Sequence, residues 1–207
     1  MKKLAVIGGG GHGKVVADIA EQLGWTISFF DAAYPKVTHC GKWSVVGTDD
    51  SLYALKNDYD AVFVAIGNNN IRFDRQRKFK SLGFNVATLI SPKANVNDGV
   101  ITGEGTLIVS NACVNIDTRI GEGVIINTGA NIDHDCQIDD FSHISPGVNL
   151  AGGVSVGVCT WIGIGTSVVQ QVNIDDNVII GAGAVVICNI PANVTAVGCP
   201  AKTIHNH

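Results

Sequence analysis

The sequence is poor in charged residues, aromatic residues and proline, and these shortages narrow the class of protein. Charged residues make up 15% of the 207 residues, the formal net charge is -4, and Lys and Arg form no cluster. Because a general nucleic-acid binder needs a basic patch, we expect no nucleic-acid partner. Only 5 residues are proline, whereas 25 are glycine and 46% are hydrophobic. This composition is typical of a packed protein with many tight turns and little disorder.

The sequence also lacks a long apolar run, so we expect no membrane insertion. The basic start "MKKLAVIGGGG" has too short an apolar stretch for a signal peptide. No cysteine belongs to a CxxC pair or lies at a zinc-finger spacing from a histidine. We therefore expect a cytoplasmic protein whose thiols are reduced and pack as small apolar groups. These thiols belong to Cys40, Cys113, Cys136, Cys159, Cys188 and Cys199.

Strand and helix patterns alternate in the first half of the chain. Four apolar segments predict strands, at residues 2–8, 25–31, 59–67 and 84–90, and three segments predict helices, at residues 13–24, 49–55 and 71–83. Strands that alternate with helices indicate a parallel sheet. The sequence therefore predicts a small α/β, Rossmann-like domain over residues 1–88.

The second half has a different period, because an apolar residue recurs at every sixth position from Ile90 to Val186. Sixteen of these seventeen residues are Ile, Val or Leu, and Thr102 is the exception. A strand and a turn repeated every six residues can wind into a triangular coil with three hexads per turn and the large aliphatic residue inside. Stacked coils bury one continuous core. The sequence therefore predicts an all-β parallel β-helix of nearly six coils, within a second domain over residues 89–207.

These hexads resemble the left-handed β-helix of the hexapeptide-repeat acyltransferases. Together with the glycine-rich start, the whole chain resembles the bacterial sugar acetyltransferase family of PglD-type UDP-4-amino-sugar N-acetyltransferases and NeuD-type sialic acid O-acetyltransferases. The resemblance implies acetyl-CoA as co-substrate and a homotrimer with active sites between neighbouring β-helices. It rests on "GGGGHGKVV", "FFD", "AIGNN", "NIDHDCQIDDFSHISPGVNLAGG" and "VGCPAK".

The glycine-rich stretch "AVIGGGGHGKVV" fits two phosphate-binding patterns. It fits the dinucleotide pattern GxGxxG, but a domain of this size has only half of the usual two-part dinucleotide fold. It also fits the ATP-binding pattern GxxxxGK, but Val15 stands where a Ser or Thr would hold magnesium. Under either pattern, backbone N–H groups at the start of a helix can bind an anionic group.

The family resemblance assigns this domain to a sugar nucleotide. It implies that Gly10, Gly11 and His12 lie near the sugar and the diphosphate. It also implies that three residues lie near the nucleoside, namely Asp31, Ala32 and Gly67. The family can have two successive acids after the second strand, and Ala32 replaces the second of them here. The identity of the base therefore stays open.

Acetyl transfer from a thioester needs a group that takes a proton from the acceptor, and histidine suits this task at neutral pH. His134 and His143 lie inside the hexad array at positions outside the core pattern, so we expect both to project outward. Asp133 and Asp135 flank His134, and a carboxylate can orient an imidazole as in a catalytic triad. The alternative is an ordinary polar turn. The resemblance implies that His134 is the general base and Asp135 its helper.

The resemblance also implies an acetyl-CoA site. Its residues would be His143, Gly152 with its N–H toward the thioester carbonyl, Ile164 along the pantetheine, Ala182 at a family glycine, and Lys202 near a phosphate. A solvated lysine is the alternative for Lys202. A class of carbonic anhydrase uses three zinc-binding histidines on the same β-helix, but only two histidines lie within this array, so we expect no metal.

Taken together, the resemblance predicts an acetyl-CoA-dependent N-acetyltransferase for the 4-amino group of a nucleoside-diphosphate 4-amino-4,6-dideoxy sugar, with UDP as the first choice of nucleotide. One alternative is O-acetylation of sialic acid or another sugar by the same base. A second alternative is a nucleotide-binding β-helix module without catalysis. The sequence leaves open the base, the sugar and the glycan pathway.

Overall fold

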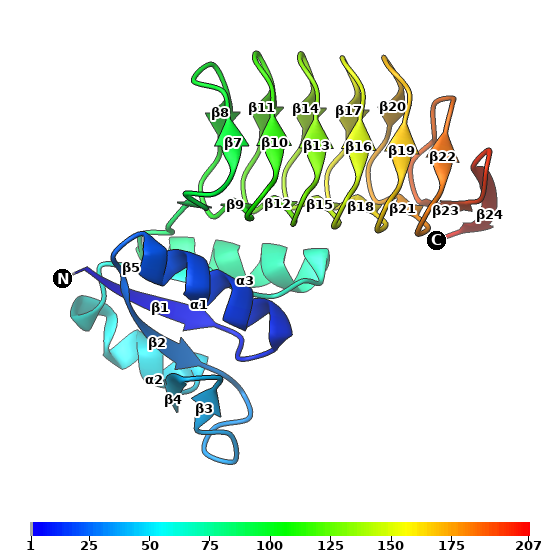
Figure 1. Cartoon of the computed structure of the whole chain (residues 1–207). Helices are drawn as coiled ribbons and strands as arrows, with labels where there is room; N and C mark the ends of the chain where they lie inside the picture. Colours follow the sequence, from blue (N-terminus) through cyan, green and yellow to red (C-terminus); the bar gives the residue numbers. More distant parts are fainter. Residues whose placement is uncertain (1) are drawn as a thin grey trace. The chain divides into compact units, whose positions relative to one another are not determined.

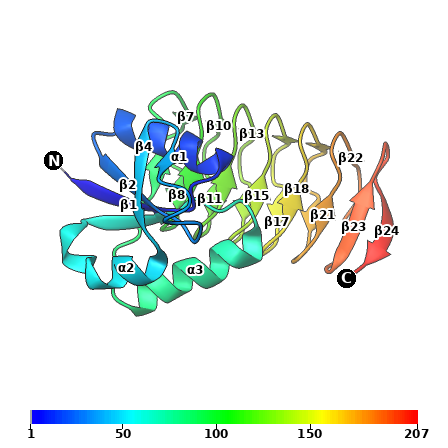
Figure 2. The same cartoon turned by 90° about the horizontal axis from the view of Figure 1, so that it is seen from below.

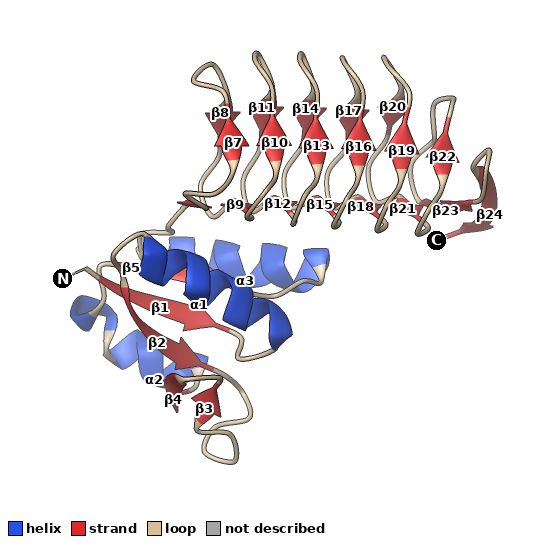
Figure 3. Ribbon diagram, in the orientation of Figure 1, coloured by secondary structure: helices blue, strands red, loops and turns tan. Residues whose placement is uncertain are grey.

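The computed structural model describes residues 2–207 and divides the chain into two compact units. The first unit ends at Pro92, and the second spans Lys93–His207. Figure 3 shows that the first unit combines helices with strands, whereas the second is built from short strands and turns. No helix within residues 2–207 is long and apolar enough to cross a membrane.

The first unit is built on a five-stranded sheet in the order β3-β4-β2-β1-β5 (Figure 1). β1 pairs in parallel with β2 on one side and with β5 on the other, so the loops that follow these three strands leave from the same edge. The strands are β1 (Lys3–Ile7), β2 (Thr26–Phe30), β3 (His39–Cys40), β4 (Trp43–Gly47) and β5 (Ala61–Val64). The helices are α1 (Gly11–Gln22), α2 (Asp49–Ala54), the 3-10 helix η1 (Lys56–Asp58) and α3 (Asn69–Ser81).

An apolar cluster joins the sheet to α2 and α3, because side chains of both layers are buried together. Its members are Ala5, Ile7, Phe30, Leu52, Val62, Val64, Phe79 and Phe84. On α1, glycine at position 13 allows close packing against β1 and β2. A Cβ there would collide with the Gly8 carbonyl and lie 3.0 Å from the Phe29 ring. The predicted α/β unit is confirmed.

Two details of the first unit differ from the sequence prediction. Within the predicted strand 84–90, only Leu89–Ile90 (β6) is a strand, and Val86 makes an isolated bridge to Val62. The hairpin of β3 and β4 was not predicted, because its strands are short and its apolar residues follow no clear alternation. Its Cys40 thiol donates a hydrogen bond to the Gly10 carbonyl at 3.7 Å, which brings the hairpin against the glycine-rich loop.

The second unit is a stack of coils with three faces, visible from two directions in Figures 1 and 2. Each face is a sheet that we name by its first strand, and its strands are parallel except for β24, which pairs antiparallel with β23. The β7 face comprises β7 (Asn95–Val96), β10 (Cys113–Val114), β13 (Asn131–Ile132), β16 (Asn149–Leu150), β19 (Ser167–Val168) and β22 (Val185–Val186). The β8 face comprises β8 (Ile101–Thr102), β11 (Arg119–Ile120), β14 (Gln137–Ile138), β17 (Ser155–Val156) and β20 (Asn173–Ile174). The β6 face comprises β6, β9 (Leu107–Ile108), β12 (Ile125–Ile126), β15 (His143–Ile144), β18 (Trp161–Ile162), β21 (Ile179–Ile180), β23 (Val194–Val197) and β24 (Lys202–Asn206).

The predicted hexad pattern corresponds directly to these strands. In each two-residue strand from β6 to β22, the second residue is the sixth-position residue of the pattern, aliphatic everywhere except at Thr102. Most of these side chains are buried, for example Ile144 and Ile162, both 0% exposed. Ile144 pairs with Ile162 across one coil, so residues eighteen positions apart lie directly next to each other in the stack. Three hexads per coil are therefore confirmed.

Buried hydroxyl groups connect the coils near their corners. The Thr160 hydroxyl donates to the Asp175 carbonyl at 2.8 Å and accepts from the Val178 N–H at 3.0 Å. One coil earlier, the Ser142 hydroxyl donates to the Gly157 carbonyl at 2.6 Å and accepts from the Thr160 N–H at 3.1 Å. These small polar residues satisfy backbone groups that would otherwise be buried without a partner.

We predict that Thr160→Val destabilises the second unit, because valine keeps the shape of threonine but leaves both backbone partners unsatisfied. The expected loss is about 1–3 kcal/mol of unfolding free energy. The measurement is urea unfolding followed by circular dichroism. Thr203→Val, on the exposed strand β24, is the matched control and should leave the midpoint unchanged. Equal midpoints for Thr160→Val and the parent protein would contradict the prediction.

Candidate active site

The β7/β8 corner, where the chain passes from the β7 face to the β8 face, carries His134. The turns at this corner repeat every eighteen residues, so His134 lies between Ile116 of the preceding coil and Gly152 of the next. A Cβ on Gly152 would lie 2.6 Å from the His134 Cε1 atom and 2.7 Å from its Nε2 atom. The imidazole therefore packs against the backbone of residue 152, and only glycine at this position leaves room for the ring.

Asp135 holds the other side of the imidazole. Its Oδ2 atom lies 2.7 Å from His134 Nδ1, and the His134 side chain is 56% exposed. The hydrogen bond that His134 Nδ1–H donates to Asp135 raises the pKa of His134 above its ordinary value, and the charge of Asp133 adds to this effect. Because Nδ1 faces a carboxylate, Nε2 is the ring atom that can exchange a proton with a bound molecule.

A groove of about 490 Å³ lies at a different corner, the β6/β7 corner, and brings together three of the predicted acetyl-CoA residues. His143, Ile164 and Ala182 all line it. His143 lies on the outer side of β15, as expected, but it is only 6% exposed. The reason is local packing: its ring centroid lies 4.3 Å from that of Trp161, and its Nε2 atom lies 3.1 Å from the Asn127 amide nitrogen.

Asn127 and Trp161 are groove residues that sequence reasoning missed. Trp161 follows His143 by eighteen residues, so the coil length alone places the two side by side. That spacing was the available signal. Asn127, Ser145 and Gly163 occupy the same turn position in three successive coils, eighteen residues apart. All three line the groove.

One chain does not bring the two corners together. His134 and Gly152 belong to the β7/β8 corner, whereas His143, Ile164 and Ala182 belong to the groove at the β6/β7 corner. The strands of the β7 face run between the two corners. Lys202 begins the exposed strand β24 and is outside both groups.

In the first unit, the predicted nucleotide residues gather where β1, β2 and β5 end. Ligands of open α/β sheets bind at this carboxyl edge. Gly10 is the N-cap of α1 and Gly11 its first residue, and neither a capping side chain nor an acidic residue occupies the first turn. Asp31 Oδ2 accepts the Gly9 N–H at 2.7 Å, and its Oδ1 accepts the Ala33 N–H at 2.8 Å. The Asp31 carboxylate therefore ties the glycine-rich loop to the end of β2. Ala32, which follows Asp31 in the chain, is exposed.

Arg72 is a buried cation at this edge that sequence reasoning did not single out. Its side chain is 1% exposed, and it donates to the carbonyls of Ile66 and Gly67 at 3.0 and 2.9 Å and to the Asn69 amide oxygen at 2.9 Å. Burial, helped by the charge of Arg72, lowers the pKa of His12 to about 4. The Nε2 atom of His12 is buried without a hydrogen-bond partner among residues 2–207.

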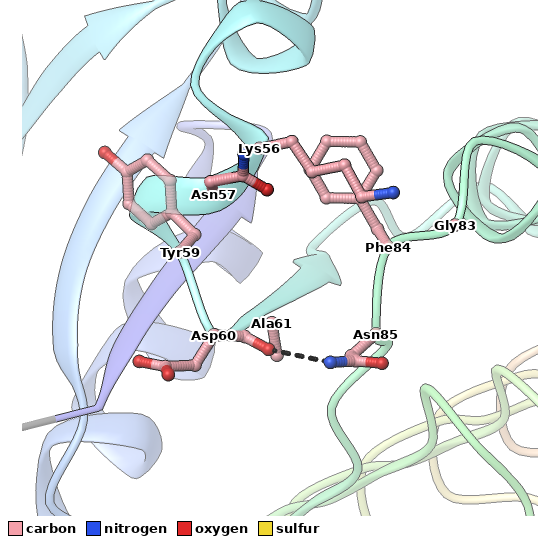
Figure 4. A pocket seen from close by; sticks show the side chains of 8 residues that line it. All are labelled: Lys56, Asn57, Tyr59, Asp60, Ala61, Gly83, Phe84 and Asn85. Atoms are coloured by element: carbon pink, nitrogen blue, oxygen red, sulfur yellow. Dashed lines mark hydrogen bonds between the residues drawn. The ribbon is translucent and has the colours of Figure 1, made fainter.

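A cavity of about 320 Å³ in the first unit lies at the opposite edge of the sheet, where β5 begins (Figure 4). Two of its polar side chains have partners within the unit. Lys56 Nζ donates to the Leu82 carbonyl at 2.6 Å, and the Asn85 amide donates to the Asp60 carbonyl at 3.2 Å. These hydrogen bonds connect the loops around the cavity, and none of the predicted site residues lines it.

The fold and these two corners define a class of protein: a hexapeptide-repeat β-helix enzyme with an α/β domain before it. The family of PglD N-terminal domains matches residues 3–79. UDP-N-acetylbacillosamine N-acetyltransferase of Bacillus subtilis is 38% identical over 110 residues, which are 51% of this chain and 50% of that protein. The match thus spans about half the length of this curated relative.

Solved structures match the whole chain. A histidine-to-asparagine mutant of perosamine N-acetyltransferase from Caulobacter crescentus, in complex with CoA and GDP-perosamine, is 38% identical with a TM-score of 0.95, and the match covers 100% of this chain and 98% of that one. The acetyltransferase domain of PglB from Neisseria gonorrhoeae, in complex with acetyl coenzyme A, is 41% identical with a TM-score of 0.94, over 98% and 99% of the two chains. This chain belongs to the family of these sugar N-acetyltransferases.

The two imidazoles should titrate far apart, because their surroundings differ. We predict that histidine NMR signals show a midpoint above 6.5 for His134 and near 4 for His12. Asp135→Asn should lower the His134 midpoint, since the hydrogen bond from the imidazole to a charged carboxylate is lost. Asp139→Asn, in the next turn, is the control and should leave it in place. An unchanged His134 midpoint in Asp135→Asn would show that this contact does not form in solution.

Proposed function

We propose that this protein is an acetyl-CoA-dependent N-acetyltransferase that acts on an amino sugar linked to a nucleoside diphosphate. The first candidate acceptor is the 4-amino group of a UDP-linked 4-amino-4,6-dideoxy sugar. The observation that carries the proposal is the exposed His134 imidazole, whose Nδ1 atom lies 2.7 Å from Asp135 while its other ring nitrogen is left for an incoming amine. The CoA and nucleotide-sugar complexes of the relatives support it.

In the proposed reaction, the sugar amine attacks the thioester carbonyl and a C–N bond forms. His134 Nε2 takes the proton of the amine, and Asp135 stabilises the imidazolium that results. The Gly152 N–H donates to the tetrahedral oxyanion. The C–S bond then breaks, and the proton on His134 neutralises the departing coenzyme A thiolate.

The first unit is proposed to recognise the sugar nucleotide. Uncapped N–H groups at Gly10, Gly11 and His12 suit a diphosphate, because the start of a helix favours negative charge. The unpartnered Nε2 atom of His12 suits a polar group of the bound sugar. Asp31, Ala32 and Gly67 would face the nucleoside. Relatives named for UDP-linked and GDP-linked sugars are both known, so the base stays open.

The second unit is proposed to hold acetyl-CoA between two copies of this chain, in a homotrimer. The supporting observation is the separation of the corners within one chain: His134 and Gly152 occupy the β7/β8 corner, and the apolar groove with Ile164 and Ala182 occupies the β6/β7 corner. If the groove of one copy meets the His134 corner of the next, the thioester comes within reach of the base. Lys202 then supplies a cation for a phosphate of the coenzyme.

The test of the activity is coenzyme A thiol release from acetyl-CoA with a panel of acceptors. The panel contains a UDP-linked 4-amino-4,6-dideoxy sugar, its dTDP- and GDP-linked counterparts, and free sialic acid. We expect release with one nucleotide amino sugar and a loss of about 10²–10⁴-fold in kcat/KM for His134→Ala. His39→Ala, at an exposed position outside both corners, is the control. Release with sialic acid alone would favour O-acetylation, and near-normal turnover by His134→Ala would exclude His134 as the base.

Subunit mixing tests whether the site is shared between copies. We expect His134→Ala and the groove-filling variant Ala182→Trp to be inactive separately and to regain thiol release when co-expressed, because some interfaces then combine an intact base with an intact groove. His134→Ala co-expressed with Asp135→Ala is the matched control and should stay inactive, since both lesions affect the same corner. No recovery in the first mixture would argue for a site built within one chain.

A further inference from the structure

Asp133 precedes the proposed base, and the reaction described above gives it no role. Its carboxylate does not contact the imidazole: its Oδ1 atom accepts the backbone N–H of His134 at 2.9 Å. The same oxygen accepts a hydrogen bond from the Asn115 side-chain amide, also at 2.9 Å. Asn115 lies eighteen residues earlier, so it belongs to the turn directly adjacent in the stack. One carboxylate oxygen thus joins the backbone of His134 to the preceding coil.

Other hydrogen bonds secure the same turn on both sides. The Thr118 hydroxyl donates to the Asp133 carbonyl at 2.9 Å, and the Asp135 N–H donates to the Ile116 carbonyl at 3.2 Å. On the opposite side, the Gly153 N–H donates to the His134 carbonyl at 2.9 Å. Asp135 has a φ of 59°, in the left-handed region that non-glycine residues rarely adopt. A turn with this backbone needs external contacts to keep its shape.

This anchoring matters because the imidazole itself is only partly enclosed. The His134 side chain is 56% exposed and touches Gly152 on one side and Asp135 on another. A side chain that packing does not enclose takes its position from its backbone and from its hydrogen bonds. Small displacements of a catalytic group are costly, since a misplacement of about 1 Å can reduce a rate about 10²-fold.

We propose that Asp133, held by Asn115, is a positioning residue for His134: the pair fixes the turn so that the imidazole stands between Gly152 and Asp135. This inference rests on the proposed function for its catalytic consequence. It leaves the proton transfer itself to His134 and Asp135. Asp133 acts on the base in two separable ways, through the hydrogen bond to the backbone and through its charge.

The charge component has a defined direction. The hydrogen bonds from Asn115 and from the His134 N–H hold the pKa of Asp133 below its ordinary value, so the carboxylate is ionised at neutral pH. Its negative charge contributes to the raised pKa of His134, after the larger contribution from Asp135. At the same corner, the turn of the preceding coil adds one further charged residue, Asp117. The turn of the following coil, residues 151–154, has no titratable side chain.

Three variants separate the two contributions. Asp133→Asn keeps an oxygen that can accept both N–H groups and removes the charge, so we expect kcat above pH 8 within about threefold of the parent and a His134 midpoint at lower pH. Asp133→Ala and Asn115→Ala remove the anchor, so we expect kcat to fall about 10–100-fold while KM for acetyl-CoA stays within about twofold. The double variant Asp133→Ala/Asn115→Ala should have the same kcat as Asp133→Ala alone, because the two residues act as one unit.

Asn131→Ala is the matched control. Asn131 lies on the β7 face and makes the same kind of bond between coils, with its amide 2.9 Å from the Asn149 side-chain oxygen, but its side-chain amide donates to Gly129 and Asn149 and not to the 133–135 turn. We expect its kcat and pH profile to match the parent. Equal losses in Asn115→Ala and Asn131→Ala would overturn the proposal, and so would a parent-like kcat in Asp133→Ala.

The NMR titration of His134 keeps this test independent of the acceptor sugar. If none of the panel sugars is acetylated, the proposed function fails, yet the Asp133 variants must still change the His134 signal. We expect Asp133→Ala to broaden or shift the His134 resonances and Asn131→Ala to leave them in place. Parent-like His134 signals and midpoint in Asp133→Ala would overturn the positioning role even if the enzyme is active.

Discussion

The second unit depends on one constraint, the parallel pairing of each strand from β7 to β22 with the strand eighteen residues away. Cys113 pairs with Asn131, and Asn131 pairs with Asn149, in a register that does not shift along the stack. Each position in a coil therefore belongs to a column with a constant environment. One set of columns holds the aliphatic core, another holds buried hydroxyls that satisfy backbone groups, and a third lines the outer corners. Local chemistry can change at one corner residue without altering the core beneath it.

The proposed site uses this constraint to hold an exposed side chain. An imidazole buried in a core is positioned by packing, but such burial would also hide it from a substrate and lower its pKa, as it does for His12. At the β7/β8 corner, the coil backbone replaces that packing, and Gly152 occupies the column position where any Cβ would displace the ring. The same geometry separates His134 from the groove around Trp161, because a triangular coil cannot fold one corner onto another. In the proposed homotrimer, a second copy of the chain brings its groove to the His134 corner.

The sequence predicted the β-helix in detail, because a period of six carries its own register. Every sixth residue from Ile90 to Val186 stands at the second position of a strand, and this includes Thr102, the one residue of the series that is not aliphatic. The α/β unit was harder, since its strands depend on contacts between distant segments. The short hairpin of β3 and β4 and the loss of most of the strand 84–90 reflect such contacts. Within the candidate site, the neighbours in a column could be read from the interval of eighteen, as for His143 and Trp161. The buried guanidinium of Arg72 could not, because a charged helix gives no sign of which charge turns inward.

His12 and His134 show why two acids flank one imidazole and none flanks the other. His12 is kept neutral by burial and by the nearby charge of Arg72, so in its proposed role it exchanges hydrogen bonds with the sugar nucleotide without changing charge. As the proposed base, His134 needs the opposite property, because a stronger base accepts a proton more readily from an attacking amine. A raised pKa also means that a larger fraction of His134 is protonated before the reaction begins. The two carboxylates contribute to the raised pKa of His134 in different ways, since Asp135 hydrogen-bonds the ring, whereas Asp133 hydrogen-bonds the backbone N–H and acts on the imidazole through its charge.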